Sequence, residues 1–320
     1  MEPREEVVEE MVPETNGAAG GVVIETRELT KRYRGVTAVD RLTLRVHAGE
    51  VYGFLGPNGA GKTTTLRMLL GLVRPTSGTA TVLDARPGSS EGLAQIGALV
   101  EAPGFYPFLS ARDNLRVMAL HAGVEATRID VVLDEVRLGD RAGDRFDTYS
   151  QGMKQRLGVA SSLLKDPEVL ILDEPTTGLD PKGMAEMRSF IRGLRGGGRT
   201  VLLSSHLMPE VEQVCDRVGV IHRGRLVREG TVDELRGGRS LLVRAEPLEH
   251  AERLLQALPE VASVHTDDGA LMITAEPMAT PVINRALVAA GVAVSELRSE
   301  RLSLEEVFLE LTRDTEGMAP

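Results

Sequence analysis

The most informative part of this sequence reads Gly56-Pro57-Asn58-Gly59-Ala60-Gly61-Lys62-Thr63-Thr64. It matches the pattern Gly-x-x-x-x-Gly-Lys-Ser/Thr and lies between an apolar run, Val51–Leu55, and a stretch with helical periodicity, 63–72. In a chain with 34 glycines but few lysines, a chance match has a probability of roughly 1%. An ordinary glycine turn is therefore a poor explanation, and the pattern predicts a strand, a phosphate-binding loop and a helix.

The composition of this loop suits an anion. Glycines let successive backbone N–H groups turn toward one ligand, and the start of the following helix adds partial positive charge. Lys62 adds a mobile full charge for the β- and γ-phosphate oxygens, and the Thr63 hydroxyl is a ligand for Mg²⁺. We therefore expect residues 56–64 to hold the phosphates of a nucleotide.

Two adjacent carboxylates end an apolar run at Val169-Leu-Ile-Leu-Asp173-Glu174-Pro175. We expect this run to be a buried strand that carries Asp173 to the sheet edge beside the phosphate loop, where it can hold hydrated Mg²⁺. Glu174 points differently and can polarise an attacking water molecule. Many strands end in acidic turns, so this interpretation depends on the phosphate loop upstream.

The wider pattern predicts an α/β fold. Val22–Leu29 and Leu42–Val46 alternate as half-exposed strands do, and further apolar runs lie at Val201–Ser204 and Val218–Ile221. Buried strands that alternate with helices favour a mostly parallel sheet covered on both faces. We expect this sheet in a domain of residues 22–236, with a mainly helical segment inserted at about 86–165.

Residues 237–320 form a second predicted domain. Strands are indicated at Leu241–Ala245, Val261–His265, Leu271–Ala275 and Val292–Glu296, and helices at about Leu248–Leu258 and Pro281–Ala290. This β-α-β-β-α-β order is that of a ferredoxin-like α+β fold. A last amphipathic helix is predicted from Ser303 to about Leu311. No catalytic set stands out here, and the segment could regulate, dimerise or only pack.

Length and charge narrow the class of protein. A chain of 320 residues suits two domains, and no apolar run approaches the ~20 residues that cross a bilayer. The start of the chain lacks the pattern of a secretory signal, and a single cysteine excludes an intramolecular disulfide. The net charge of −10 argues against general nucleic-acid binding. Residues 1–21 are expected to be an acidic flexible tail, or alternatively a partner-binding arm.

A resemblance becomes specific at Tyr149-Ser150-Gln151-Gly152-Met153-Lys-Gln-Arg156. With the loop and the acidic pair, it resembles the nucleotide-binding subunit of an ATP-binding cassette (ABC) transporter, whose signature is usually Leu-Ser-Gly-Gly-Gln. Ser150 and Gly152 match, whereas Tyr149, Gln151 and Met153 depart. The resemblance implies a phosphate-loop ATPase in which residues 150–153 contact the γ-phosphate of ATP held by the opposite subunit.

Three further residues receive roles from this resemblance. Tyr33 would stack on adenine, although a tyrosine near a strand is often only packed. Asp180, in Gly178-Leu-Asp180, falls in the family's D-loop, which touches the partner subunit. His206 matches the switch histidine and would act with Glu174 and Lys62 in catalysis.

Glu101 stands where most such proteins carry the glutamine of the Q-loop. An ionised glutamate can only accept hydrogen bonds and adds negative charge beside Mg²⁺. This substitution, together with the altered signature, resembles the branch linked to antibiotic immunity and drug export. We expect Glu101 to contact Mg²⁺ or a water molecule, as Thr63 and Asp173 do, and to couple the site to a membrane partner.

The favoured function is therefore the ATP-hydrolysing subunit of an exporter. It would need ATP, Mg²⁺, a second copy or homologue that completes the ATP sandwich, and a separate membrane permease, and it would sit on the inner face of the cell membrane. Pro103–Leu115 would dock the permease, or would only cover the helical insert. The alternatives are a non-transport ABC protein that acts on nucleic acid or ribosomes, and a phosphate-loop kinase, which leaves the signature and His206 unexplained.

Overall fold

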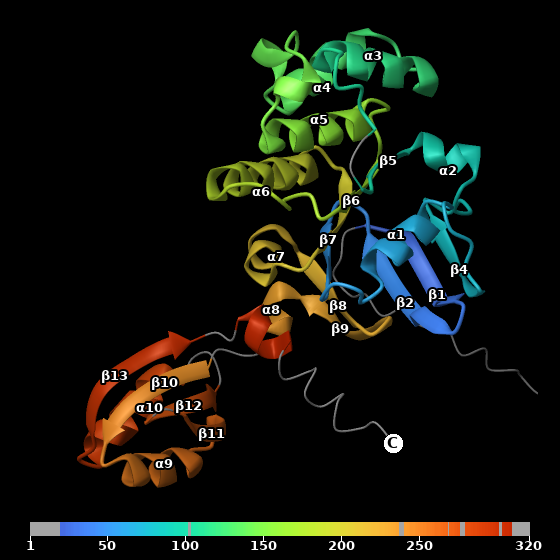
Figure 1. The fold of residues 1–320 in the computed structure, drawn as a ribbon. Coiled ribbons are helices and arrows are strands. Elements are labelled where there is room, and N and C mark those ends of the chain that lie inside the picture. Colours follow the sequence, from blue (N-terminus) through green and yellow to red (C-terminus); the bar gives the residue numbers. More distant parts are fainter. Residues whose placement is uncertain are drawn as a thin grey trace, which may run out of the picture.

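The computed structural model describes residues 20–101, 104–236, 240–267, 269–275, 279–300 and 303–308. Most of the expected acidic tail, Pro103 and the end of the last predicted helix lie outside these residues. Within them, no helix has both the length and the apolar character that crossing a membrane requires. Figure 1 shows the chain from its N-terminal sheet in blue to its C-terminal strands in red.

A six-stranded sheet forms the centre of the nucleotide-binding part (Figure 1). Its strands, in spatial order, are β5 (Ile96–Leu99), β6 (Val169–Asp173), β7 (Thr200–Ser205), β3 (Val51–Leu55), β8 (Arg217–His222) and β9 (Arg225–Thr231). Neighbouring strands run parallel except at β8 and β9, which are antiparallel. Every residue of β3 is buried, as its apolar sequence predicts. The carboxyl ends of β3, β6 and β7 therefore lie side by side.

A second, antiparallel sheet covers one side of this unit. It has the order β2 (Val36–His47), β1 (Val22–Tyr33) and β4 (Ser77–Val82). Its inward side chains share one apolar cluster with β3, β6 and helix α1 (Lys62–Leu69). Helix α1 starts one residue earlier than predicted and ends at Leu69 rather than at 72, because Leu70 caps it and Gly71 adopts a positive φ of 73°.

The remaining helices of the nucleotide-binding part, apart from α2, contribute to another apolar cluster. These remaining helices are α2 (Ser90–Ala94), α3 (Ala111–Ala122), α4 (Thr127–Glu135), α5 (Gln151–Leu163), α6 (Pro181–Gly196), α7 (Met208–Val214) and α8 (Val232–Leu235), with short 3-10 turns at Gly139–Arg141 and Phe146–Thr148. The range 86–165 is not purely a helical insert, because it contains β5, an edge strand of the central sheet. Four residues are too few to show a strand period, and pairing with β6 decides their conformation.

The C-terminal elements follow the predicted β-α-β-β-α-β order. They are β10 (Ser240–Glu246), α9 (Leu248–Gln256), β11 (Val261–Asp267), β12 (Ala270–Ala275), α10 (Thr280–Ala289) and β13 (Ala293–Glu300). The sheet order β11-β12-β10-β13 and its antiparallel pairings give the ferredoxin-like arrangement, with an apolar core of its own. A helix over 304–308 follows, and its Leu304 packs in the core of the nucleotide-binding part.

Candidate active site

The phosphate loop connects β3 to α1 and is shaped by its glycines. Gly59 and Gly61 have φ angles of 81° and 108°, which side chains on an L-residue disfavour. A Cβ on Gly56 would lie 2.4 Å from the carbonyl oxygen of Ile221, and one on Gly61 would lie 2.4 Å from that of Ala38. Larger residues at these places would therefore deform the loop and its contacts with the neighbouring strands.

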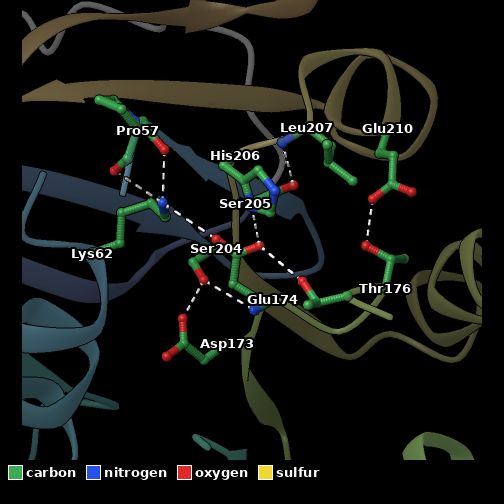
Figure 2. A network of polar contacts seen from close by, with 12 residues as sticks. Pro57, Lys62, Asp173, Glu174, Thr176, Ser204, Ser205, His206, Leu207 and Glu210 are labelled. Carbon is green, nitrogen blue, oxygen red and sulfur yellow. Dashed lines mark hydrogen bonds and ion pairs between the residues drawn. The ribbon is translucent and has the colours of Figure 1, made fainter. Parts of the chain in front are cut away.

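Lys62, the first residue of α1, is folded back over the loop. Its Nζ donates to the carbonyl oxygen of Gly56 at 2.6 Å and to that of Pro57 at 3.3 Å, and it lies 3.3 Å from Oε1 of Glu174. The side chain is only 6% exposed. The cation is thus held inside the loop and faces the carboxylate at the end of β6 (Figure 2).

Asp173 joins the loop to the sheet. Its Oδ2 accepts a hydrogen bond from the Thr63 hydroxyl at 2.8 Å, and its Oδ1 accepts one from the Ser204 hydroxyl. The sheet register, which pairs Asp173 with Ser204 on β7, explains this second contact. A carboxylate beside a threonine hydroxyl offers the hard oxygen ligands that Mg²⁺ prefers. These residues fit the metal that the sequence predicts.

Glu174 has a positive φ of 50°, which turns its side chain away from the direction of β6. Its backbone N–H donates to Ser204 Oγ at 3.1 Å. Its Oε2 lies 2.6 Å from Nδ1 of His206 and accepts a hydrogen bond from the Thr177 hydroxyl at 3.2 Å. The carboxylate is therefore fixed by the loop that follows β7 as well as by its own loop (Figure 2).

Lys62, Glu174 and His206 face one open cavity of about 360 Å³, whereas Asp173 lies outside its lining. It is lined by Ala38, Pro57, Asn58, Gly59, Gly61, Lys62, Thr63, Thr64, Glu174, Thr177 and His206. Gly56 and Ala60 of the predicted loop lie behind this surface, and the Ala60 carbonyl accepts from the Gly224 N–H at 2.9 Å. A cavity that joins a cationic side chain, backbone N–H groups and a carboxylate–histidine pair can bind a polyphosphate and activate water against it.

The signature segment faces a different cavity, of about 410 Å³. Ser150 caps α5, with its hydroxyl accepting from the Met153 N–H at 3.3 Å, and Asp180 caps α6 by accepting from the Gly183 N–H at 2.9 Å. Gln151, Gly152 and Met153 line this cavity together with those two residues. None of its lining residues belongs to the phosphate cavity, so in the described part of one chain the two predicted half-sites do not meet.

Tyr33 and Glu101 also lie outside the lining of the phosphate cavity. Tyr33 is the last residue of β1, 44% exposed, with Lys31 Nζ 4.8 Å from its ring centre. Glu101 has a φ of 72° and forms an ion pair with Arg67 on α1. The adenine role of Tyr33 and the metal role of Glu101 stay predictions.

Two residues that organise the site were missed by the sequence reasoning. Ser204 hydrogen-bonds both Asp173 and Glu174, and Thr177 hydrogen-bonds Glu174. Ser204 lies two positions before His206 on an apolar strand, and Thr177 three positions after Glu174. Their closeness in the sequence to Glu174 and His206 is the feature from which their role could have been predicted.

Comparisons with known proteins agree with this geometry. A sequence model of the family described as ABC transporter matches residues 39–177, which include the phosphate loop, the signature and the acidic pair. The bacitracin transport ATP-binding protein of Bacillus licheniformis is 39% identical over 297 residues, which cover 90% of this chain and 97% of that protein. The daunorubicin resistance ATP-binding protein of Streptomyces coeruleorubidus is 40% identical over 296 residues, covering 89% of this chain and 94% of that protein.

A solved structure is similar as well. It is the ATP-binding subunit of an ABC transporter, 30% identical to this chain, with a TM-score of 0.60. The likeness covers 67% of this chain and 92% of the solved one.

Proposed function

The chain belongs to the ABC transporter family as an ATP-binding subunit, and on this premise we propose that it hydrolyses ATP to power export of an antibiotic or drug-like compound. One observation carries the proposal. At the mouth of the phosphate cavity, Glu174 Oε2 meets His206 Nδ1 at 2.6 Å, and Oε1 lies 3.3 Å from Lys62 Nζ. A general base and a phosphate-binding cation thus share one cavity.

Each of these residues has a separate role in the proposed hydrolysis. Lys62 and the N–H groups of the loop bind the β- and γ-phosphate oxygens, and Asp173 and Thr63 hold Mg²⁺, which neutralises phosphate charge when bound. Glu174 accepts a proton from the water that attacks the γ-phosphorus, and the bond to the ADP oxygen breaks. His206 fixes the carboxylate through Nδ1–H, and only the doubly protonated, cationic imidazole can also donate from Nε2 to the γ-phosphate.

A second copy or a homologous subunit would complete the site. Ser150, Gln151, Gly152 and Met153 line a cavity separate from that of Lys62, at the N-terminus of α5. A helix N-terminus with a serine and a glycine suits an incoming phosphate. We therefore propose that two chains close head to tail, so that each signature covers the other chain's ATP.

The permease partner would dock beside the helical insert. Tyr106 and Phe108 are 48% and 64% exposed, and their ring centres are 5.8 Å apart. Next to them lies a groove of about 370 Å³ lined by Phe105, Tyr106, Met118 and other residues of the insert. Exposed aromatic side chains beside an open groove are suited to receive an apolar helix of a partner. In this arrangement the chain acts on the inner face of the cell membrane.

The partner can be tested with two matched variants. Tagged chain, co-expressed with a candidate permease, should co-purify with that permease from detergent-solubilised membranes. Phe108→Ser should lower the recovered amount of membrane protein, whereas Leu72→Ser, which removes a similarly exposed leucine in the turn after α1, should not. Equal recovery with both variants would place the docking surface elsewhere.

The transported compound is proposed from the relatives' names, bacitracin transport and daunorubicin resistance. Cells that carry the chain with its membrane partner should tolerate a higher concentration of such a compound than cells that carry Glu174→Gln with the same partner. Equal tolerance toward a panel of these compounds would argue against export, even if the purified chain hydrolyses ATP.

Glu101 is proposed to link the site to the permease through its ion pair with Arg67. The pair joins the Q-loop region to α1, which begins with Lys62 and Thr63. Exposed ion pairs contribute only about 0–1 kcal/mol, so Glu101→Gln should hardly change the free energy of unfolding. It should instead change the stimulation of ATP hydrolysis by the permease. Unaltered stimulation in the reconstituted complex would remove this role.

A further inference from the structure

A buried carboxylate next to the active site has no part in the reaction described above. Glu210 of α7 is 6% exposed. Its Oε2 accepts a hydrogen bond from the Thr176 hydroxyl, whereas Oε1 accepts no hydrogen bond within the described residues and lies 3.8 Å from Nη1 of Arg188. The adjoining cavity is only about 10 Å³, room for one water molecule at most, so bulk solvent does not reach the charge.

The position of this contact in the chain is informative. Thr176 lies two residues after Glu174, and Glu210 lies four residues after His206. The loop that follows β6 and the loop that follows β7 are therefore joined twice. The first contact is Glu174 with His206, and the second is Thr176 with Glu210, on the side away from the phosphate loop (Figure 2).

Packing alone does not account for a glutamate at this place. Burying a carboxylate is costly unless hydrogen bonds and a counter-charge satisfy it, and here one oxygen lacks a hydrogen bond. Apolar neighbours such as Ile191, Leu203 and Val211 surround it, so an apolar residue would suit the surroundings better. What the carboxylate supplies is a directed hydrogen bond to the loop of the catalytic base.

We propose that Thr176 and Glu210 are positioning residues that keep His206 Nδ1 at hydrogen-bonding distance from Glu174 Oε2. This inference rests on the proposed ATPase function and deepens it. Arg188, on α6, neutralises the buried carboxylate and connects the same contact to the helix that Asp180 caps. Neither Thr176 nor Glu210 lines the phosphate cavity, so they act through the alignment of the base and not by touching ATP.

The test is a set of steady-state ATPase measurements on the full-length chain. Thr176→Val keeps the shape of the side chain and removes the donor, and a misaligned catalytic group can cost up to ~10²-fold in rate. We expect kcat to fall by about 10-fold or more with little change in the KM for ATP. Thr176→Ser and Glu210→Gln, which preserve a donor and an acceptor, should keep most of the activity.

A second background distinguishes positioning from general destabilisation. When His206 is already replaced by alanine, Thr176→Val should have almost no further effect on kcat, because its target is missing. Thr200→Val is the matched control, since Thr200 is a buried threonine at the opposite end of β7 whose hydroxyl accepts from the Gly49 N–H at 2.9 Å. It should lower the melting temperature but leave kcat close to that of the parent chain.

Two results would overturn the inference. One is a normal kcat for Thr176→Val, and the other is an equal fall in kcat with and without His206. Either result leaves the proposed function intact as long as the parent chain hydrolyses ATP. If the parent chain has no ATPase activity with Mg²⁺, alone or with its permease, the proposed function itself is wrong.

Discussion

Nδ1 of His206 lies 2.6 Å from Oε2 of Glu174, and the two residues follow neighbouring parallel strands, β7 and β6. The other oxygen of Glu174 faces Lys62 Nζ at 3.3 Å. The carboxylate thus lies between the group that orients it and the cation that binds phosphate. In the proposed mechanism, Lys62 binds the phosphates instead of Glu174, and Glu174, still in contact with His206, accepts a proton from water.

The first prediction concerns the general base. Glu174→Gln preserves the size of the side chain and removes its ability to take a proton. ATP binding should be retained, and ATP hydrolysis should fall by ~10²–10⁴-fold, the size of a positioned acid–base contribution. Fluorescent ATP titration and phosphate release measure the two quantities. Near-normal turnover would assign proton transfer to another group.

The second prediction concerns the phosphate cation. Lys62→Ala should weaken ATP binding itself, because the cavity loses its buried full charge. A hydrogen bond to a charged group contributes ~1.5–3 kcal/mol, which corresponds to a loss of affinity of at least about 10-fold. Calorimetry with ATP measures the change, and Lys165→Ala, at an exposed lysine outside the lining of the phosphate cavity, is the control. Unaltered affinity in Lys62→Ala would contradict the loop assignment.

The third prediction uses the separation of the two cavities. Gly152→Asp adds a negative charge to the signature cavity at little structural cost, since a Cβ there meets only Leu179 at 3.8 Å. Removing favourable electrostatics from such a site costs ~10²-fold or more in rate. When the Gly152→Asp chain is mixed with the Lys62→Ala chain, however, ATPase activity should return. In a head-to-tail pair of the two variants, the intact phosphate loop of one chain meets the intact signature of the other. No recovery on mixing would argue that each chain works alone.

Much of this site could be predicted from the sequence because its chemistry is local. Residues 56–64 and the Asp173–Glu174 pair are contiguous, and their spacing to the signature identified the ABC family, which the comparisons confirm. The mostly parallel sheet and the C-terminal β-α-β-β-α-β order are likewise confirmed.

The parts that could not be predicted depend on contacts between distant segments. Strand β5 is four residues long and becomes a strand only by pairing with β6. Ser204 holds Asp173 because the sheet register brings them together, and Glu210 meets Thr176 across 34 positions. Arg67 pairs with Glu101 although nothing in their spacing indicates it. Such pairings follow from tertiary packing, which a periodic pattern does not encode.

The fourth prediction concerns stability at high pH. Tyr52 of β3 is fully buried, and its hydroxyl donates to Glu229 Oε1 at 3.0 Å. Burial, followed by the charge of Glu229, raises the pKa of Tyr52 well above 10. The phenol therefore stays neutral in the folded chain, whereas it ionises near pH 10 when the chain unfolds.

The stabilising contribution of Tyr52 is thus complete below pH 10 and is lost as the pH rises further. At pH 7, Tyr52→Phe should lower the free energy of unfolding by about 1 kcal/mol, since Glu229 keeps Arg217 as a partner. Urea titrations followed by circular dichroism should show this difference shrinking above pH 10. A constant difference up to pH 11 would contradict the assignment.

The last prediction makes the single cysteine a reporter of opening. Cys215 is 9% exposed, and its Sγ would lie 2.8 Å from a Cβ built on Gly53 of β3, so it packs directly against the central sheet. Burial raises the pKa of this thiol, with Asp216 adding to the shift, and the reactive thiolate is therefore scarce in the folded chain. At pH 8 a thiolate-specific reagent should label the native chain at least ~10³-fold more slowly than the chain unfolded in guanidinium, because labelling must wait for opening.

Since a ligand that binds only the folded state stabilises it by about 2.7 kcal/mol at 100 times its Kd, saturating ATP should slow labelling of Glu174→Gln further, up to ~100-fold. Rapid labelling of the native chain, insensitive to ATP, would mean that the sheet around Cys215 opens independently of the nucleotide site.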